Sequence, residues 1–258
     1  MRGVLSLLVL VFQSAVGLYG QGLSNSTNHT LGYSLGFVQA KEENLVPKVH
    51  SGAMHSLTYS MEMMNDVYHC LEFQLGYGSL STAIDQDAGS MNAQLMLGYS
   101  CNFKMYERNT LTYCLGPKIS YTSSLSEYQT WDEAHAYWGT SLSLGASSVV
   151  FVELESNQSL VMHLDLSLLG FSARPDQHRL YSNEHWTFSN IMTIMNRDYR
   201  FGVWNNTFQL KASAEYRTPV AGSSTLVLFS SLYYSRLKAD AGNPLREIIS
   251  RIGIGVGL

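Results

Sequence analysis

The segment spanning residues 92–105 alternates strictly between apolar and polar positions. Its apolar positions are Ala93, Leu95, Leu97, Tyr99, Cys101, Phe103 and Met105, and its polar or small positions are Asn92, Gln94, Gly98, Ser100, Asn102 and Lys104. A period of two places successive side chains on opposite faces of an extended strand. The segment is therefore predicted to be a long strand with one continuous apolar face.

The same alternation recurs along the chain. Its apolar faces fall at residues 31–37, 57–63, 71–77, 93–105, 111–121, 137–155, 160–168, 208–216, 225–238 and 252–258. Which residues face which way is ambiguous in the sixth and ninth of these segments. The pattern predicts about ten strands and no domain linker.

The connections between these strands alternate between short and long. Short turns are expected at residues 65–66, 107–109, 156–158 and 221–223, and longer links at 42–51, 79–90, 123–135, 173–201 and 238–245. Short periplasmic turns, long outer loops and an even number of strands are typical of bacterial outer-membrane barrels. We therefore predict an all-β fold, a transmembrane antiparallel β-barrel of about ten strands.

The composition agrees with membrane-spanning strands. Charged residues are 14% of the chain, against about 25% in ordinary soluble domains, yet the mean hydropathy is only -0.04. Alternating strands give this average, because each apolar residue has a polar neighbour. The net charge of -4 leaves no basic surface for nucleic acid.

The N-terminal segment resembles an export signal. It has one early positive charge at Arg2, an apolar run over residues 4–12 and small residues up to Gly20. We expect residues 1–20 to be a cleaved signal peptide, residues 21–29 a short lead-in and residues 30–258 the barrel, located in the bacterial outer membrane. The last strand is similar to a barrel-assembly signal, although it ends in Leu258 rather than an aromatic residue.

Ionisable residues share the polar face of the predicted strands. They are Glu62, Glu72, Lys104, Lys118, His163, Asp165, Lys211, Glu215 and Arg251. In a soluble sandwich this face would contact water, and that fold is the alternative. In a narrow barrel the interior is mostly side chains, and an unpaired buried charge is costly. The pattern predicts a paired polar network in the lumen and disfavours a pore for small solutes.

The same alternation predicts where the aromatic residues lie and which way the cysteines face. Tyr and Trp near the strand ends are expected to form interfacial girdles; they are Tyr33, Tyr77, Tyr99, Tyr121, Trp138 and Tyr216. Cys70 is expected to face the lumen and Cys101 the lipid. Together with Cys114 they make an odd count, without metal-ligand spacing, so no metal site and no cofactor are predicted.

Two short motifs in long loops could carry chemistry. Asp85 and Asp87 lie in the second outer loop, and Asp176 and His178 lie in the fourth. This arrangement resembles the omptins, ten-stranded outer-membrane proteases with an Asp-x-Asp and an Asp-x-His in those loops. The resemblance implies that Asp176 orients His178, and that His178 with Asp85 and Asp87 activates a water. Ordinary turn chemistry explains the same acidic residues.

Other constellations are weaker. A Ser–His hydrolase pair would use His163 with Ser167, or His55 with Ser56, although His163 beside Asp165 fits a lumen hydrogen-bond network better. The loop histidines His135, His178 and His185 lack the neighbouring ligands of a metal site. None of these patterns predicts a specific activity.

The fourth outer loop, residues 174–201, is the longest and is rich in aromatic residues. It carries Tyr181, His185, Trp186, Phe188 and Tyr199. Such a loop either contacts partners or surface glycolipid, or packs as a lid on the barrel mouth.

The chain as a whole is similar to uncharacterised ten-stranded barrels of Bacteroidota. The likeness is carried by the step at residues 172–175 and by Gly242-Asn243-Pro244 before the last strand, and it implies fold and location only. The sequence favours a non-enzymatic interaction or accessory role in the envelope, with lipid, a surface glycan or another envelope protein as partner. An omptin-like protease and a narrow pore are the alternatives.

Overall fold

The computed structural model describes residues 27–42, 49–82, 89–128, 135–174, 179–180, 187–220, 224–238 and 244–258. Its elements are β1 (Thr27–Glu42), β2 (Val49–Met64), β3 (Val67–Thr82), β4 (Ser90–Arg108), β5 (Leu111–Tyr128), β6 (His135–Glu153), η1 (Glu155–Asn157), β7 (Ser159–Ala173), β8 (Arg179–Leu180), α2 (Phe188–Met195), β9 (Arg200–Val203), β10 (Thr207–Pro219), β11 (Thr225–Leu237) and β12 (Leu245–Gly257). The proposed leader, residues 1–20, lies outside the described residues. Among the described segments, no helix is long and apolar enough to cross a membrane.

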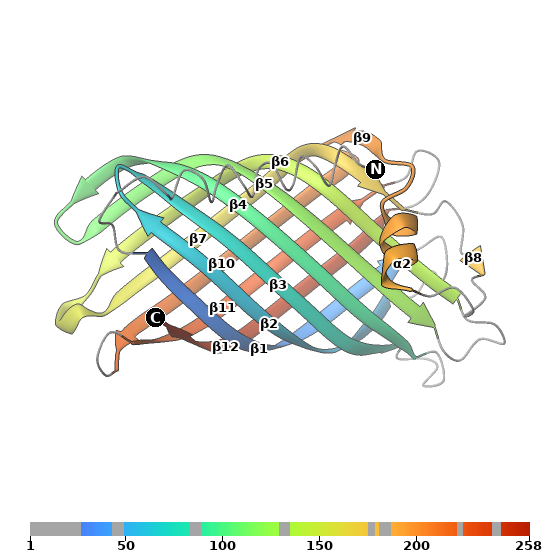
Figure 1. Ribbon diagram of the computed structural model, residues 1–258, viewed down its shortest axis with the longest axis horizontal. Coiled ribbons are helices and arrows are strands. Elements are labelled where there is room, and N and C mark those ends of the chain that lie inside the picture. Colours follow the sequence, from blue (N-terminus) through green and yellow to red (C-terminus); the bar gives the residue numbers. More distant parts are fainter. Residues whose placement is uncertain are drawn as a thin grey trace.

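Ten of these strands close into one antiparallel barrel (Figure 1). Strands β1 to β7 pair in sequence order, followed by β10, β11 and β12, and β12 returns to pair with β1. The closing ladder runs from Thr30 opposite Gly257 to Glu42 opposite Leu245. The prediction of an all-β, ten-stranded antiparallel barrel is confirmed, and the soluble sandwich is wrong because the sheet closes on itself.

The strand β9 continues the line of β10 along the edge of β7. Val203 pairs with Leu169, and Gln209 pairs with Ser167. Residues 204–208 thus lie opposite the single residue Leu168, and the chain turns tightly there, with the Asn206 amide donating to the Val203 carbonyl at 2.7 Å. The sequence pattern did not reveal β8 and α2, which fall within the predicted fourth loop, or β9, which begins at its end.

The strands are longer than the alternation indicated, so the links are shorter. The β2–β3 turn lies at residues 65–66, as expected. The turn after β4 uses Asn109 with a φ of 47°, and η1 places Ser156 and Asn157 at 63° and 60°, a region that Asn tolerates better than most residues. The expected turn at 221–223 lies outside the described residues.

Burial alternates along the strands in the inverse sense of a soluble protein. On β12, Ile252 is 76% exposed whereas its neighbour Arg251 is 3% exposed. The apolar residues therefore form the outer wall and the polar ones fill the interior, as in a barrel surrounded by lipid.

The structure shows which residues of β6 and β11, the sixth and ninth predicted strands, face the interior. On β6, Ser141, Ser143 and Ser147 are buried in the interior, and on β11 Tyr233 and Ser235 are. The β6–β7 ladder shifts register between Leu144 and Gly145. The extra residue of this bulge is Leu168 of β7, so β6 keeps its period of two. The sixth strand was ambiguous in the sequence because serine, glycine and alanine fall on both of its faces.

Two glycines of the closing strands make room for an aromatic ring inside the barrel. A Cβ added at Gly32 would lie 2.9 Å from the Phe229 ring, and one at Gly253 would lie 2.3 Å from it. The missing side chains on β1 and β12 thus form the recess into which the Phe229 ring of β11 packs.

We predict that Gly253→Ala destabilises the barrel by about 1–3 kcal/mol, because the added methyl group overpacks this recess. Its Cβ would also lie 2.6 Å from the Tyr33 carbonyl oxygen, which cannot rotate away. The measurement is the urea midpoint of unfolding in lipid vesicles. Gly257→Ala is the control, since its nearest contact is 3.4 Å; equal midpoints for the two variants would contradict the prediction.

Candidate functional site

The middle of the barrel interior holds a network of four charged side chains from four strands. Lys118 of β5 donates to Glu72 of β3 at 2.9 Å and to Asp165 of β7 at 2.6 Å. Lys211 of β10 donates to the other oxygen of Glu72 at 2.7 Å, and Ser147 donates to Asp165 at 2.7 Å. Two cations and two anions leave this network without net charge.

A glycine allows the central ion pair to form across an intervening strand. Gly98 of β4 pairs with Glu72 of β3, and Lys118 of β5 pairs with Ser100, two residues further along β4. A Cβ at Gly98 would lie 3.1 Å from the Lys118 Cε and 3.3 Å from the Glu72 carboxylate. A larger residue at this inward position would push the two charged groups apart.

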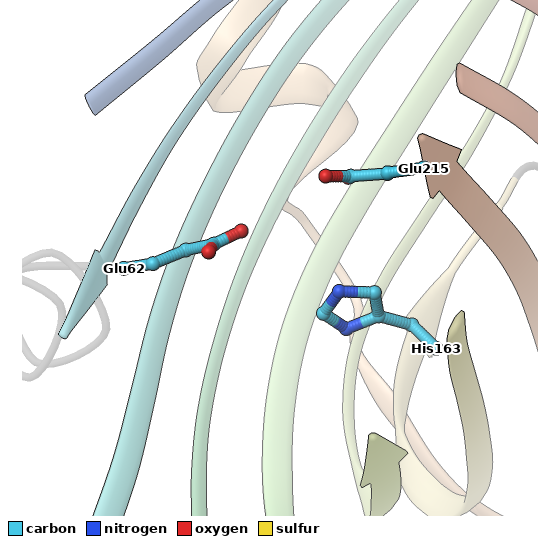
Figure 2. A group of neighbouring side chains, drawn as sticks. All are labelled: Glu62, His163 and Glu215. Carbon is cyan, nitrogen blue, oxygen red and sulfur yellow. The ribbon is translucent and has the colours of Figure 1, made fainter. Parts of the chain in front are cut away.

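A second charged cluster lies nearer the short turns. Arg217 donates to both oxygens of Glu62, at 2.7 and 2.6 Å, and to Glu215 at 3.2 Å through Nε. His163 is buried beside them. Figure 2 shows Glu62, His163 and Glu215 pointing toward a common centre, and their ligating atoms lie within 4.8 Å of one another.

Uncharged polar side chains continue the filling toward the loop end. Gln209 donates to Thr122 at 2.9 Å and accepts from Ser143 at 3.1 Å. Arg251 donates to the Gln94 amide oxygen at 2.7 Å, and the Gln74 amide oxygen, turned toward it, accepts from the same guanidinium at 2.9 and 2.8 Å. The hydrogen bonds of Arg251 connect β12 with β3 and β4 through the interior. Those of Gln209 connect β10 with β5 and β6.

Apolar side chains form two further buried clusters in the interior. One buried cluster consists of Tyr68, Cys70, Cys114, Val149 and Val161, and another of Val38, Ala40, Met54, Leu80, Tyr233 and Ile249. Between the charged network and Gln209 lies a cavity with about 40 Å³ of space for water-sized molecules, lined by Glu72, Lys118 and Tyr233 among others. A water needs about 10–15 Å³ on this measure, so the cavity has room for a few waters.

Eight of the nine ionisable residues expected in the lumen belong to these interior groups, and Lys104 stands apart. Its nearest acidic partner is Glu107 at 3.1 Å, three residues along, and Glu107 is largely exposed. Lys104 is still in register, opposite Cys114, but it lies near the β4–β5 turn, where residues 103–111 are all exposed. The residues predicted to face the lumen did not include Arg217, although it continues the inward series of Lys211 and Glu215 on β10.

The residues of the loop motifs are not placed. Asp85, Asp87, Asp176 and His178 lie outside the described residues, as do Tyr181, His185 and Trp186. The structure therefore neither brings the two omptin-like motifs together nor separates them.

The other suggested pairs are placed. Ser167 of β7 lies 3.5 Å from Ser120, and no hydrogen bond joins it to His163 within the described residues. His55 is on the outer wall, where it shares a hydrogen bond with Tyr33, whereas Ser56 is buried on the inner face. Cys70 and Cys114 are buried and Cys101 is half-buried, and all three are free thiols.

The described part of the fourth loop lies against the barrel wall rather than over its mouth. The Tyr121 hydroxyl donates to the Asn196 side-chain oxygen at 3.0 Å, and Tyr199 donates to the same oxygen. The helix α2, at the end of the barrel opposite the short turns (Figure 1), contacts β6. Tyr121 and Trp138, expected as exposed girdle residues, are consequently buried at 5%.

Aromatic side chains remain exposed beside this helix. Phe171 of β7 and Phe201 of β9 pack edge to face at 5.5 Å between ring centroids, and Trp204 is 68% exposed. Inside the mouth, Arg174 donates to the Leu237 carbonyl at 2.6 Å and to the Tyr137 hydroxyl at 2.8 Å. The loop end of the barrel is therefore hydrogen-bonded on its inner side and carries exposed aromatic side chains on its outer side.

We predict that Lys118→Met lowers the free energy of unfolding by about 3–5 kcal/mol, because it leaves Asp165 and Glu72 without their shared cation in the interior. The matched control is Lys104→Met, which removes an exposed pair worth less than about 1 kcal/mol. Urea unfolding of both variants in vesicles measures the difference. Similar losses for the two would show that the interior network does not stabilise the fold.

No protein-family model and no curated protein matches the chain. Solved structures do match: the outer membrane protease OmpT from Escherichia coli has a TM-score of 0.55 at 7% identity, covering 92% of this chain and 98% of that one. The translocator domain of the autotransporter NalP from Neisseria meningitidis has a TM-score of 0.44 at 10% identity, covering 98% and 96%. At such identities the likeness to OmpT shows the fold alone, an outer-membrane β-barrel.

Proposed function

We propose that this outer-membrane β-barrel is a closed, non-enzymatic component of the bacterial cell envelope, which interacts with its surroundings through its wall and its loop end. The observation that carries the proposal is the filled interior. The Glu72–Lys118–Asp165 network crosses the lumen, and buried apolar clusters lie elsewhere in it. A permeating solute would have to separate these buried ion pairs, which is costly.

The contacts of such a component would involve the outer rim. Phe171, Phe201 and Trp204 are exposed there, next to the helix α2. Aromatic rings of this kind are suited to the level of lipid headgroups, so lipid is the simplest partner, and a surface glycan or another envelope protein would meet the same rim. Export would remove residues 1–20, which N-terminal sequencing of the protein from membranes would reveal.

We predict no channel activity for the folded protein in planar lipid bilayers. Its refolded state is verified by heat-modifiable migration in gels, and a refolded porin in the same bilayers is the positive control. Current traces at both polarities are expected to match those of protein-free bilayers. Reproducible single-channel steps from the verified barrel would replace the closed-barrel proposal with that of a narrow pore.

The alternative is an omptin-like protease, favoured by the two motifs of Asp85, Asp87, Asp176 and His178. Under the non-enzymatic proposal, the refolded protein leaves casein and short peptides intact. Cleavage by the wild type that is lost in both His178→Ala and Asp85→Ala would establish the protease instead. Cleavage that persists in both variants would come from a contaminating protease and is removed by further purification before the comparison.

A further inference from the structure

We propose that Glu62, His163 and Glu215 form a binding site for one divalent transition-metal ion, with Zn²⁺ as the representative ion, inside the barrel near its short turns. The three residues come from β2, β7 and β10, and their side chains converge (Figure 2). The site goes beyond the envelope role proposed above and does not depend on it.

The geometry is close to that of a coordinated ion. Zn²⁺ binds imidazole nitrogen and carboxylate oxygen at about 2.0–2.2 Å in a tetrahedral arrangement, so two ligand atoms of one ion are about 3.4 Å apart. The candidate atoms lie within 4.8 Å of one another. Each of the three atoms has to move by less than about 1 Å toward their common centre to reach the bonding distance.

His163 is the residue that points to a ligand rather than to simple packing. His163 is 6% exposed, and no hydrogen bond joins it to the described part of the chain. Its neighbours are the Glu62 and Glu215 carboxylates, within 4.8 Å, and the Tyr68 ring at 6.2 Å between centroids. Buried polar groups are nearly always paired. A metal ion held with Glu62 and Glu215 would supply the missing partner.

Both carboxylates keep acceptor capacity for an ion. Arg217 donates one hydrogen bond to each oxygen of Glu62, and it donates to only one oxygen of Glu215. The guanidinium therefore leaves a lone pair on each Glu62 oxygen and the whole second oxygen of Glu215. In the occupied site, Arg217 would orient the ligating carboxylates from the outside, as outer partners commonly do.

The charges also favour a cation here. Glu62 and Glu215 carry two negative charges and Arg217 carries one positive charge, so the carboxylates and the guanidinium leave one negative charge beside His163. The adjacent network of Glu72, Asp165, Lys118 and Lys211 is balanced. The imidazole ligand selects transition metals over Ca²⁺ and Mg²⁺, which prefer oxygen ligands.

The test is equilibrium titration of the untagged, membrane-purified protein with Co²⁺, followed by visible absorption, and then displacement by Zn²⁺. One ion per chain is expected. His163→Ala and Glu215→Gln should each weaken Zn²⁺ binding at least about tenfold. Glu215→Gln keeps the side-chain size and an oxygen for Arg217, so it reports on the site even if His163→Ala folds poorly.

The matched control is His69→Ala, which removes a histidine of the outer wall that is paired with Tyr99; it should bind Zn²⁺ as the wild type does. Absence of saturable binding by the folded wild type would overturn the proposal. It would equally be overturned by Glu215→Gln binding with wild-type affinity, or by loss of binding in His69→Ala.

Discussion

Closure of the sheet between β1 and β12 is the constraint on which the rest of the structure depends. In hydrocarbon there is no water to satisfy an unpaired strand edge, so a spanning sheet has to pair every edge. The ladder from Thr30 opposite Gly257 to Glu42 opposite Leu245 does this. Gly32 of β1 and Gly253 of β12 leave space for the Phe229 ring. The two strands that close the barrel therefore also provide this part of the interior packing.

Closing ten strands creates an interior that has to be filled. Here the filling is ionic and hydrogen-bonded in the middle and apolar in two clusters. Each buried charge of the middle network has an opposite charge within 3 Å, because an unpaired one would be expensive in this environment. A barrel filled in this way is a rigid support, and its chemistry is left to the rim and to interior groups with spare ligand capacity, such as His163.

Polar side chains on the outer wall are also paired and buried. Ser123 and Thr140 lie on the outward faces of β5 and β6, where lipid would leave their hydroxyls without partners. They contact each other at 3.3 Å and are buried, as is the neighbouring Tyr121, which bonds to Asn196 just beyond α2. The segment from α2 to β9 thus shields a polar stretch of wall, and it places Phe201 and Trp204 beside it.

The sequence by itself determined the strands, and the two faces of all but the sixth and the ninth, because a period of two is a local property that survives in any register. It also indicated which ionisable residues face inward, Glu62, Lys118 and Asp165 among them. Only the tertiary structure decided which of them meet, since Lys118 and Glu72 are joined across a third strand and Glu62 reaches Arg217 from a strand far away in the sequence. It likewise decided the burial of Tyr121, because its hydrogen bond to Asn196 joins segments that are distant in the sequence, which no local pattern records.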